Sequence, residues 1–170
     1  MCLQCDGYSH AAVLQALDLR IRVNGWTLLR VQDDDGTGWC YTVGLLEHFG
    51  HPELCIIDVE LDVGAQVISG LVKGIVARGP LAAVHPPAGF ELVEVHRNHL
   101  RGEWFAMWSE LQGSSLQSGQ MLQVLLPNGS YCECHAPLVR RLDVPGPTPS
   151  GPRRPSRKER RRRPRRGHAA

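Results

Sequence analysis

Three stretches of the chain carry apolar residues three or four positions apart, the spacing that places them on one face of a helix. Each stretch follows a residue whose side chain can accept a hydrogen bond from the first turn of a helix. A glycine ends each of the first two stretches, where it can supply the left-handed residue of a helix terminus. The predicted helices and their capping residues are 10–25 with Ser9, 63–79 with Asp62, and 99–112 with Asn98.

Short runs of β-branched, aromatic and other apolar residues lie between these stretches and predict strands. The run 53–59 is apolar at nearly every position, which is typical of a strand that is covered on both faces and is central in its sheet. Asn128-Gly129 suits the two positive φ angles of a tight turn, so the last run predicts a hairpin. The predicted strands are residues 26–31, 39–45, 53–59 and 90–95, followed by the hairpin over residues 121–134.

The order of these elements predicts the fold class. Strands come early and late in the chain with helices between them, which favours an α+β fold over alternating βαβ units. We therefore expect a single domain with a mostly antiparallel sheet and about three helices. The 42% of hydrophobic residues in a chain of 170 is enough to bury one core.

The formal net charge of +2 divides unevenly along the chain. Residues 145–170 hold ten Lys or Arg and one Glu, a net charge of +9, whereas residues 1–144 hold nine basic and sixteen acidic residues, a net charge of −7. The last 26 residues are rich in proline and have no aliphatic residue larger than alanine, so they cannot bury enough apolar surface to fold. We predict a globular domain over 1–144 and a disordered basic tail over 145–170.

The tail predicts a partner class. Cationic side chains without interspersed aromatic residues neutralise phosphates but cannot stack on bases, so any contact with nucleic acid is expected to be independent of sequence. The cations are Arg153, Arg154, Arg157, Lys158, Arg160, Arg161, Arg162, Arg163, Arg165 and Arg166.

Two features of the sequence predict the cellular compartment of the protein. No run of residues reaches the ~20 apolar positions that a membrane span needs, and the first residues lack a basic region followed by an apolar one. We therefore expect a cytoplasmic protein without a membrane span, whose six cysteines are thiols or metal ligands rather than disulfides.

Cysteine spacing suggests a zinc site. Cys2 and Cys5 have the C-x-x-C spacing of half a zinc site, and a second cluster near residue 133 can supply the other half. Unrelated cysteines and a redox pair are the alternatives. The candidate metal ligands are Cys2, Cys5, Cys132, Cys134 and His135.

Polar residues around the second and third predicted strands suggest a pocket. The histidines at 48 and 51 flank a glycine with acidic residues nearby, although they lack the helical H-E-x-x-H spacing of a metalloprotease. Turn formation and core packing are the competing interpretation of these residues. The candidate pocket residues are Tyr41, Thr42, His48, His51 and Glu53.

Several spaced motifs carry a resemblance to a known family. The chain contains MCLQCDG at its start, GW after the first predicted helix, YTVGL followed by GHPEL, and a late LQVLLPNG. In this order the motifs resemble a family of small bacterial domains, of actinobacterial type, whose function is unknown. The resemblance covers residues 1–134 and implies no reaction, cofactor or catalytic residue.

Three functional hypotheses remain open. The first is a non-catalytic domain that binds a protein or a small ligand, with the tail as an electrostatic contact to anionic polymers. The second is an enzyme that binds flavin mononucleotide or another cofactor on a split-barrel fold, an interpretation that rests on fold analogy. The third is a small domain stabilised by zinc.

Overall fold

The computed structural model describes residues 7–32, 38–79, 89–101, 103–126 and 141–143. The helices are α1 (His10–Asn24), α2 (Leu45–Phe49), α3 (Leu61–Arg78), α4 (Arg97–Leu100) and α5 (Ala106–Gln112), with a 3₁₀ turn η2 (Glu103–Phe105) before α5. The strands are β1 (Thr27–Gln32), β2 (Gly38–Val43), β3 (Glu53–Ile57), β4 (Glu91–Glu94) and β5 (Met121–Leu125).

The strands form one sheet in the order β1-β2-β3-β5-β4. Neighbouring strands are antiparallel except for β3 and β5, which are parallel. β3 is the middle strand, as its continuous apolar run predicts. The predicted α+β domain with a mostly antiparallel sheet is confirmed, and α1, α3 and α5 are its three substantial helices.

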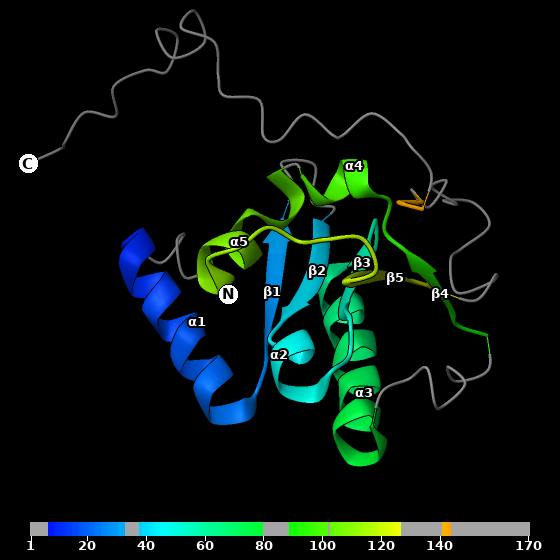
Figure 1. The fold of residues 1–170 in the computed structure, drawn as a ribbon, viewed down its shortest axis with the longest axis horizontal. Coiled ribbons are helices and arrows are strands. Elements are labelled where there is room, and N and C mark those ends of the chain that lie inside the picture. The colour runs from blue at the N-terminus through cyan, green and yellow to red at the C-terminus, as the bar shows by residue number, and fades with distance from the viewer. Residues whose placement is uncertain (1–6, 33–37, 80–88, 102, 127–140, 144–170) are drawn as a thin grey trace, which may run out of the picture.

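One face of the sheet is covered by α3, which contacts β1, β2 and β3 (Figure 1). Leu54 and Ile56 of β3 point to this face and pack in one cluster with Ile68 and Val72 of α3. All four side chains are at most 1% exposed, so this face is held by close apolar packing.

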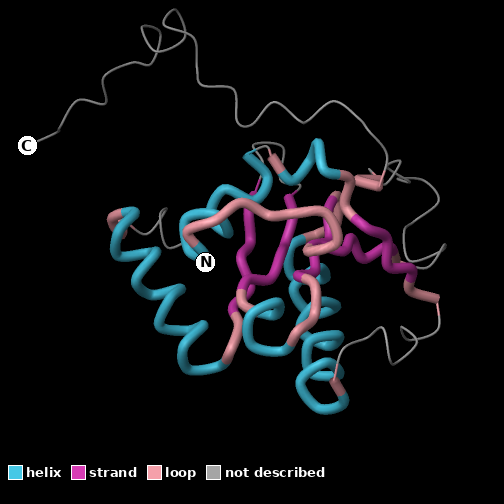
Figure 2. The backbone as a smooth tube through the Cα atoms, in the orientation of Figure 1, coloured by secondary structure: helices cyan, strands magenta, loops and turns pink. Residues whose placement is uncertain are grey.

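The opposite face is covered by several shorter elements. Cys55 and Ile57 of β3 point to it because side chains alternate along a strand, and they pack in a second cluster with Leu17 of α1 and Trp108 of α5. Figure 2 shows the loop after α5, coloured pink, running across the strands toward β5. The end of that loop is fixed to the sheet, since the backbone N–H of Glu53 donates to the carbonyl of Gln120 at 2.8 Å.

The capping prediction for α1 is confirmed, since the Ser9 hydroxyl accepts from the backbone N–H of Ala12 and Gly25 is left-handed with φ 78°. For α3 the capping prediction is wrong. The helix begins at Leu61 after Glu60, and Asp62 lies in its first turn, where the carboxylate pairs with Arg30 at 2.5 Å. A carboxylate in the first turn is still favoured by the helix dipole.

The second predicted strand is too long by two residues. β2 ends at Val43 because Gly44 has φ 108°, which breaks the extended chain, and α2 starts at Leu45. Five residues are too few to give a periodic signal, so the sequence does not predict α2.

The single helix predicted over residues 99–112 is also wrong. It is divided into α4, η2 and α5, and His96 rather than Asn98 caps α4. The 3₁₀ turn places Trp104 against Trp39, with ring centroids 4.7 Å apart. The Trp104 carbonyl accepts from the Trp39 indole at 3.0 Å, which fixes this turn against the sheet.

β5 is confirmed as the first strand of the predicted hairpin region. Leu122 and Gln123 are paired on both sides, with β3 and with β4, so this part of β5 has no free edge for a hairpin partner. Residues 127–134 lie outside the described parts of the chain. Residues 141–143 return to the sheet, where the backbone N–H of Leu142 donates to the buried amide of Gln123 at 2.7 Å.

Within the described segments, no helix combines the length and the apolar character that crossing a membrane requires.

Candidate ligand-binding site

The site is built around the Glu53 carboxyl group at the start of β3. Its side chain is fully buried and lies against the first turn of α2. Oε1 accepts from the backbone N–H groups of Gly44 at 2.8 Å and Leu46 at 3.4 Å, and Oε2 accepts from that of Leu45 at 3.3 Å. Glu53 therefore satisfies the N–H groups that a short helix leaves unpaired at its N-terminus.

Two further side chains complete this network. The Thr42 hydroxyl donates to Glu53 Oε2 at 2.6 Å and accepts from the backbone N–H of Leu54 at 2.9 Å. The Trp108 indole donates to Glu53 Oε1 at 3.3 Å. One carboxyl group thus connects β2, α2, β3 and α5.

The environment of Glu53 has opposing effects on its pKa. Burial raises the pKa because it penalises the charged form, whereas the hydrogen bonds from Thr42, Gly44, Trp108 and Leu46 lower it. Burial dominates, so the pKa lies above its ordinary value of 4.5. Both oxygens already accept hydrogen bonds, which makes this carboxyl a structural centre rather than a base exposed to a substrate.

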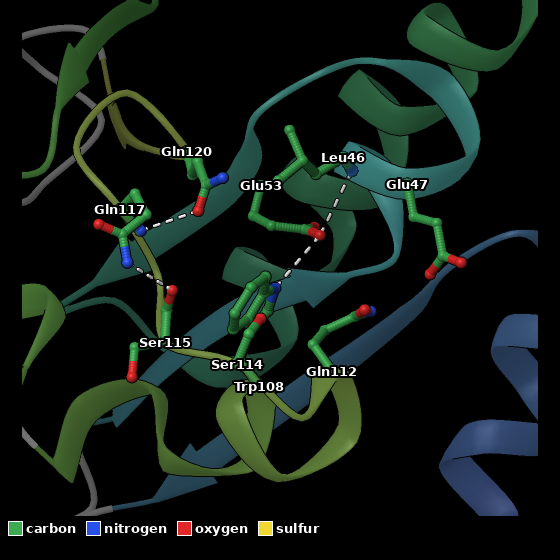
Figure 3. Close-up of a pocket in the computed structure, with 9 residues that line it drawn as sticks. All are labelled: Leu46, Glu47, Glu53, Trp108, Gln112, Ser114, Ser115, Gln117 and Gln120. Carbon is green, nitrogen blue, oxygen red and sulfur yellow. Dashed lines mark hydrogen bonds between the residues drawn. The ribbon is translucent and has the colours of Figure 1, made fainter.

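A cavity of about 340 Å³, here called the Glu53 cavity, opens beside Glu53 and Trp108 (Figure 3). Its walls come from α2, the start of β3, α5 and the loop that leads to β5. The lining residues are Leu46, Glu47, Glu53, Trp108, Gln112, Ser114, Ser115, Gln117 and Gln120.

Hydrogen bonds within the loop order part of this wall. Gln117 Nε2 donates to the carbonyl of Ser115 at 3.0 Å, and the backbone N–H of Gln117 donates to Gln120 Oε1 at 2.8 Å. The side-chain oxygen of Gln117 and the amide N–H₂ of Gln120 are thereby the ends left toward other partners. The loop offers one acceptor and one donor at neighbouring positions.

The candidate pocket residues occupy different surroundings. Among the five, Glu53 lines the Glu53 cavity, and Thr42 is bonded to it. Tyr41 is buried against Phe105 in the core, with ring centroids 5.3 Å apart. His48 lies on α2, partly exposed, with Nε2 4.0 Å from the Glu47 carboxylate.

His51 is buried beside the network rather than in the cavity wall. Nδ1 donates to the carbonyl of Pro52, which leaves Nε2 without a proton in the neutral ring. Burial lowers the pKa of His51 and the Pro52 carbonyl raises it in part, with a net lowering. The neutral imidazole is therefore the form that the folded protein favours.

The candidate zinc ligands Cys2, Cys5, Cys132, Cys134 and His135 lie outside the described residues. In the parts of the chain that the structure describes, no group of three metal-binding side chains comes together. Cys40 and Cys55 are free thiols buried in the core, and burial raises the pKa of Cys40 to about 11. A thiol with that pKa stays protonated and unreactive at neutral pH.

Sequence reasoning identifies a small part of this site. Of the lining residues, only Glu53 is among its candidates, and Thr42 is bonded to Glu53. Trp108 and residues 113–120 are not among them. A tract rich in serine and glutamine directly after a tryptophan-containing helix is the available signal.

Comparison with known proteins agrees with the resemblance noted above at the level of the family. The model of a family described as a domain of unknown function, DUF4262, matches residues 20–130, and the chain belongs to this family. The comparisons with curated proteins and with solved structures give no match. In the fold, the YTVGL and GHPEL motifs meet, because Glu53 of the second binds Thr42, Gly44 and Leu45 of the first.

Proposed function

We propose that residues 1–144 form a non-catalytic binding domain that holds a small polar ligand in the Glu53 cavity. The observation that carries this proposal is the cavity wall, where amide, hydroxyl and carboxyl groups surround a buried indole. Ligand sites commonly combine an apolar or aromatic floor with a few polar groups that orient the ligand. The volume of about 340 Å³ is in the range of small-molecule sites.

Binding fits the wall better than catalysis does. Covalent chemistry needs a nucleophile that is hydrogen-bonded to a base. The wall contains the hydroxyl groups of Ser114 and Ser115, but among the described residues neither hydroxyl is hydrogen-bonded to a His or a carboxylate. Glu53 is the buried titratable group of the wall, and its oxygens are occupied by hydrogen bonds. The flavin alternative is less well supported, because the described wall has no cationic side chain for a phosphate and carries two carboxyl groups.

The indole N–H signal of Trp108 in a nitrogen-15 NMR spectrum of the full chain tests the proposal. The probes are small polar molecules of three charge classes: butane-1,4-diamine and spermidine, butane-1,4-diol and glucose, butanedioate and citrate. We expect at least one class to shift this signal saturably at about millimolar concentration, the affinity that ligands of six or more atoms reach.

The variant Ser115→Tyr, which places a large side chain in the cavity wall, should abolish that shift. Ser69→Tyr on α3, outside the wall, is a matched control that should not. If none of the six probes shifts the Trp108 signal up to about 50 mM, far above the affinity expected of such ligands, the proposed function is wrong.

The basic tail supports a second contact. Ten cations against one acid in residues 145–170 favour anionic polymers, whereas the net charge of −7 on residues 1–144 repels them. A chain that ends at Asp143 should lose binding to DNA that the full chain shows. That binding should be equal for two unrelated duplexes, and it should fall about 10³-fold between 50 and 200 mM salt if six or more phosphates are contacted.

Equal binding by the truncated chain, or a strong preference for one duplex, would contradict the role of the tail.

The cytoplasmic location and the zinc site remain predictions. Elemental analysis of the full chain, with melting curves recorded with and without chelator, tests the zinc site, because a structural zinc contributes to folding free energy.

A further inference from the structure

The Glu53 cavity has an uneven distribution of charge. Its lining includes the carboxyl groups of Glu47 and Glu53, and among the described lining residues there is no Lys, Arg or His. The other polar side chains of the wall are uncharged amides and hydroxyls. A cavity of this composition attracts a positive charge and disfavours a negative one.

The two carboxyl groups are held differently. Glu53 is buried and fixed by hydrogen bonds, so its position relative to the cavity does not change. Glu47 lies on α2 with a side chain that is 63% exposed, and its carboxylate lies 4.0 Å from His48 Nε2, too far for a hydrogen bond. In Figure 3 the Glu47 side chain lies on the same side of Trp108 as Gln112. Glu47 can therefore turn toward a ligand.

Trp108 adds an aromatic ring to the same wall. Among aromatic side chains, the indole attracts organic cations most strongly when they lie over its face. The bond from its N–H to Glu53 fixes the ring in place. An organic cation thus finds the exposed Glu47 carboxylate and an aromatic ring in one cavity, whereas a polyol or a carboxylate finds only the hydrogen-bonding groups.

An inorganic cation fits less well. Calcium takes six to eight oxygen ligands at 2.3–2.6 Å, and the two oxygens of Glu53 already accept hydrogen bonds from five groups. The volume of about 340 Å³ is also far larger than one ion occupies.

We infer that the ligand of the Glu53 cavity is a small organic cation of the ammonium class, an inference that rests on the proposed function. Its ammonium group would lie near Glu47, and a polar group elsewhere in the molecule would bond to Gln117 or Gln120. The ligand is a metabolite-sized amine rather than a phosphate ester or a carboxylic acid.

Three probes with the same four-carbon spacing test the charge alone: butane-1,4-diamine, butane-1,4-diol and butanedioate. Each is titrated against the full chain while the Trp108 indole N–H signal is followed. We expect the diamine to bind at least about fivefold more tightly than the diol, the effect of one exposed ion pair, and the butanedioate not to bind. Raising the salt concentration should weaken the binding of the diamine and leave the binding of the diol unchanged.

Variants of exposed acids give the matched control. Glu47→Gln should weaken diamine binding about two- to fivefold without changing diol binding, because an exposed ion pair is screened by water. Glu94→Gln removes an exposed carboxylate of β4 that does not line the cavity, and it should change neither.

The outcomes separate the inference from the proposed function. If the diol or butanedioate binds as tightly as the diamine, or if calcium chloride alone shifts the signal, the inference is wrong while a binding cavity remains. If Glu47→Gln and Glu94→Gln weaken the binding of the diamine equally, the attraction comes from the overall charge of the protein, and the inference is also wrong. If no probe binds, both proposals fail.

Discussion

The two faces of the sheet are covered in different ways. On one face a single 18-residue helix, α3, packs apolar side chains against β1, β2 and β3. On the other face α1, α5 and Leu142 meet, and the buried polar side chains of Glu53 and Gln123 point among them. Glu53 connects α2 and α5 to the sheet, and Gln123 accepts from the backbone N–H of Leu142.

This difference relates packing to function. Apolar contacts are not directional, so one long helix can pack closely over several strands without fixed polar partners. Hydrogen bonds fix separate short elements at set distances, and the space between those elements becomes the Glu53 cavity. The face assembled by polar contacts is therefore the one on which the proposed binding site lies.

The largest expected effect comes from removing the carboxyl group of Glu53, which is the centre of the hydrogen bonds on the sheet face covered by α1 and α5. Glu53→Ala leaves three backbone N–H groups, the Trp108 indole and the Thr42 hydroxyl without their acceptor. Each unsatisfied buried group costs about 1–3 kcal/mol, and water from the cavity replaces some of the bonds. We expect the free energy of unfolding in urea to fall by about 3 kcal/mol or more.

Ile56→Val is the control on the α3 face, since Ile56 is equally buried on the same strand. It removes one methylene group and should cost about 1 kcal/mol. Equal losses for the two variants would mean that hydrogen bonding does not distinguish the faces.

The next largest effects are expected from alanine substitutions at two glycines, one beside Glu53 and one on α3. Gly44 has φ 108°, and a Cβ there would lie 2.6 Å from the carbonyl oxygen of Gly25. Gly44→Ala should therefore destabilise by about 2 kcal/mol, through backbone strain and displacement of α2 from Glu53. Gly70 is exposed on α3, and a Cβ at this position would meet no atom within 4 Å, so Gly70→Ala should stabilise by about 0.5–1 kcal/mol. Melting temperatures that move in the same direction would contradict this assignment.

The same difference explains how much the sequence could predict. The α3 helix and the central strand β3 follow from apolar spacing, because packing against a sheet requires that spacing. The bond between Glu53 and Trp108 joins residues 55 positions apart and leaves no periodic signal. The division of the predicted helix 99–112 depends on the contact between Trp104 and Trp39, which only the tertiary structure defines. Candidate residues on two strands were recognisable, whereas the cavity wall was not.

The third effect is a pH dependence that Glu53→Gln removes. Burial raises the pKa of Glu53 above 4.5, so the folded protein holds this proton more tightly than the unfolded chain does. The stabilisation is complete below pH 4.5 and is lost as the pH rises through the folded-state pKa. The loss is about 1.4 kcal/mol for each unit by which the pKa is raised. Relative to Glu53→Gln, the unaltered protein should become less stable between pH 4.5 and 8 in urea unfolding, and a constant difference would contradict it.

The smallest effect has the opposite sign and comes from His51. Burial lowers the pKa of His51 below 6.5, although the hydrogen bond to the Pro52 carbonyl opposes this in part. Here the unfolded chain binds the proton more tightly, so the stabilisation is present above pH 6.5 and is lost as the pH falls below it. His51→Asn keeps a donor toward the Pro52 carbonyl but does not titrate. The variant should therefore lose less stability than the unaltered protein between pH 7 and 5, by about 1.4 kcal/mol for each unit by which the pKa is lowered. Parallel urea-unfolding profiles across this interval would show that the buried imidazole takes up its proton without cost, and that the polar face tolerates a charge beside Glu53.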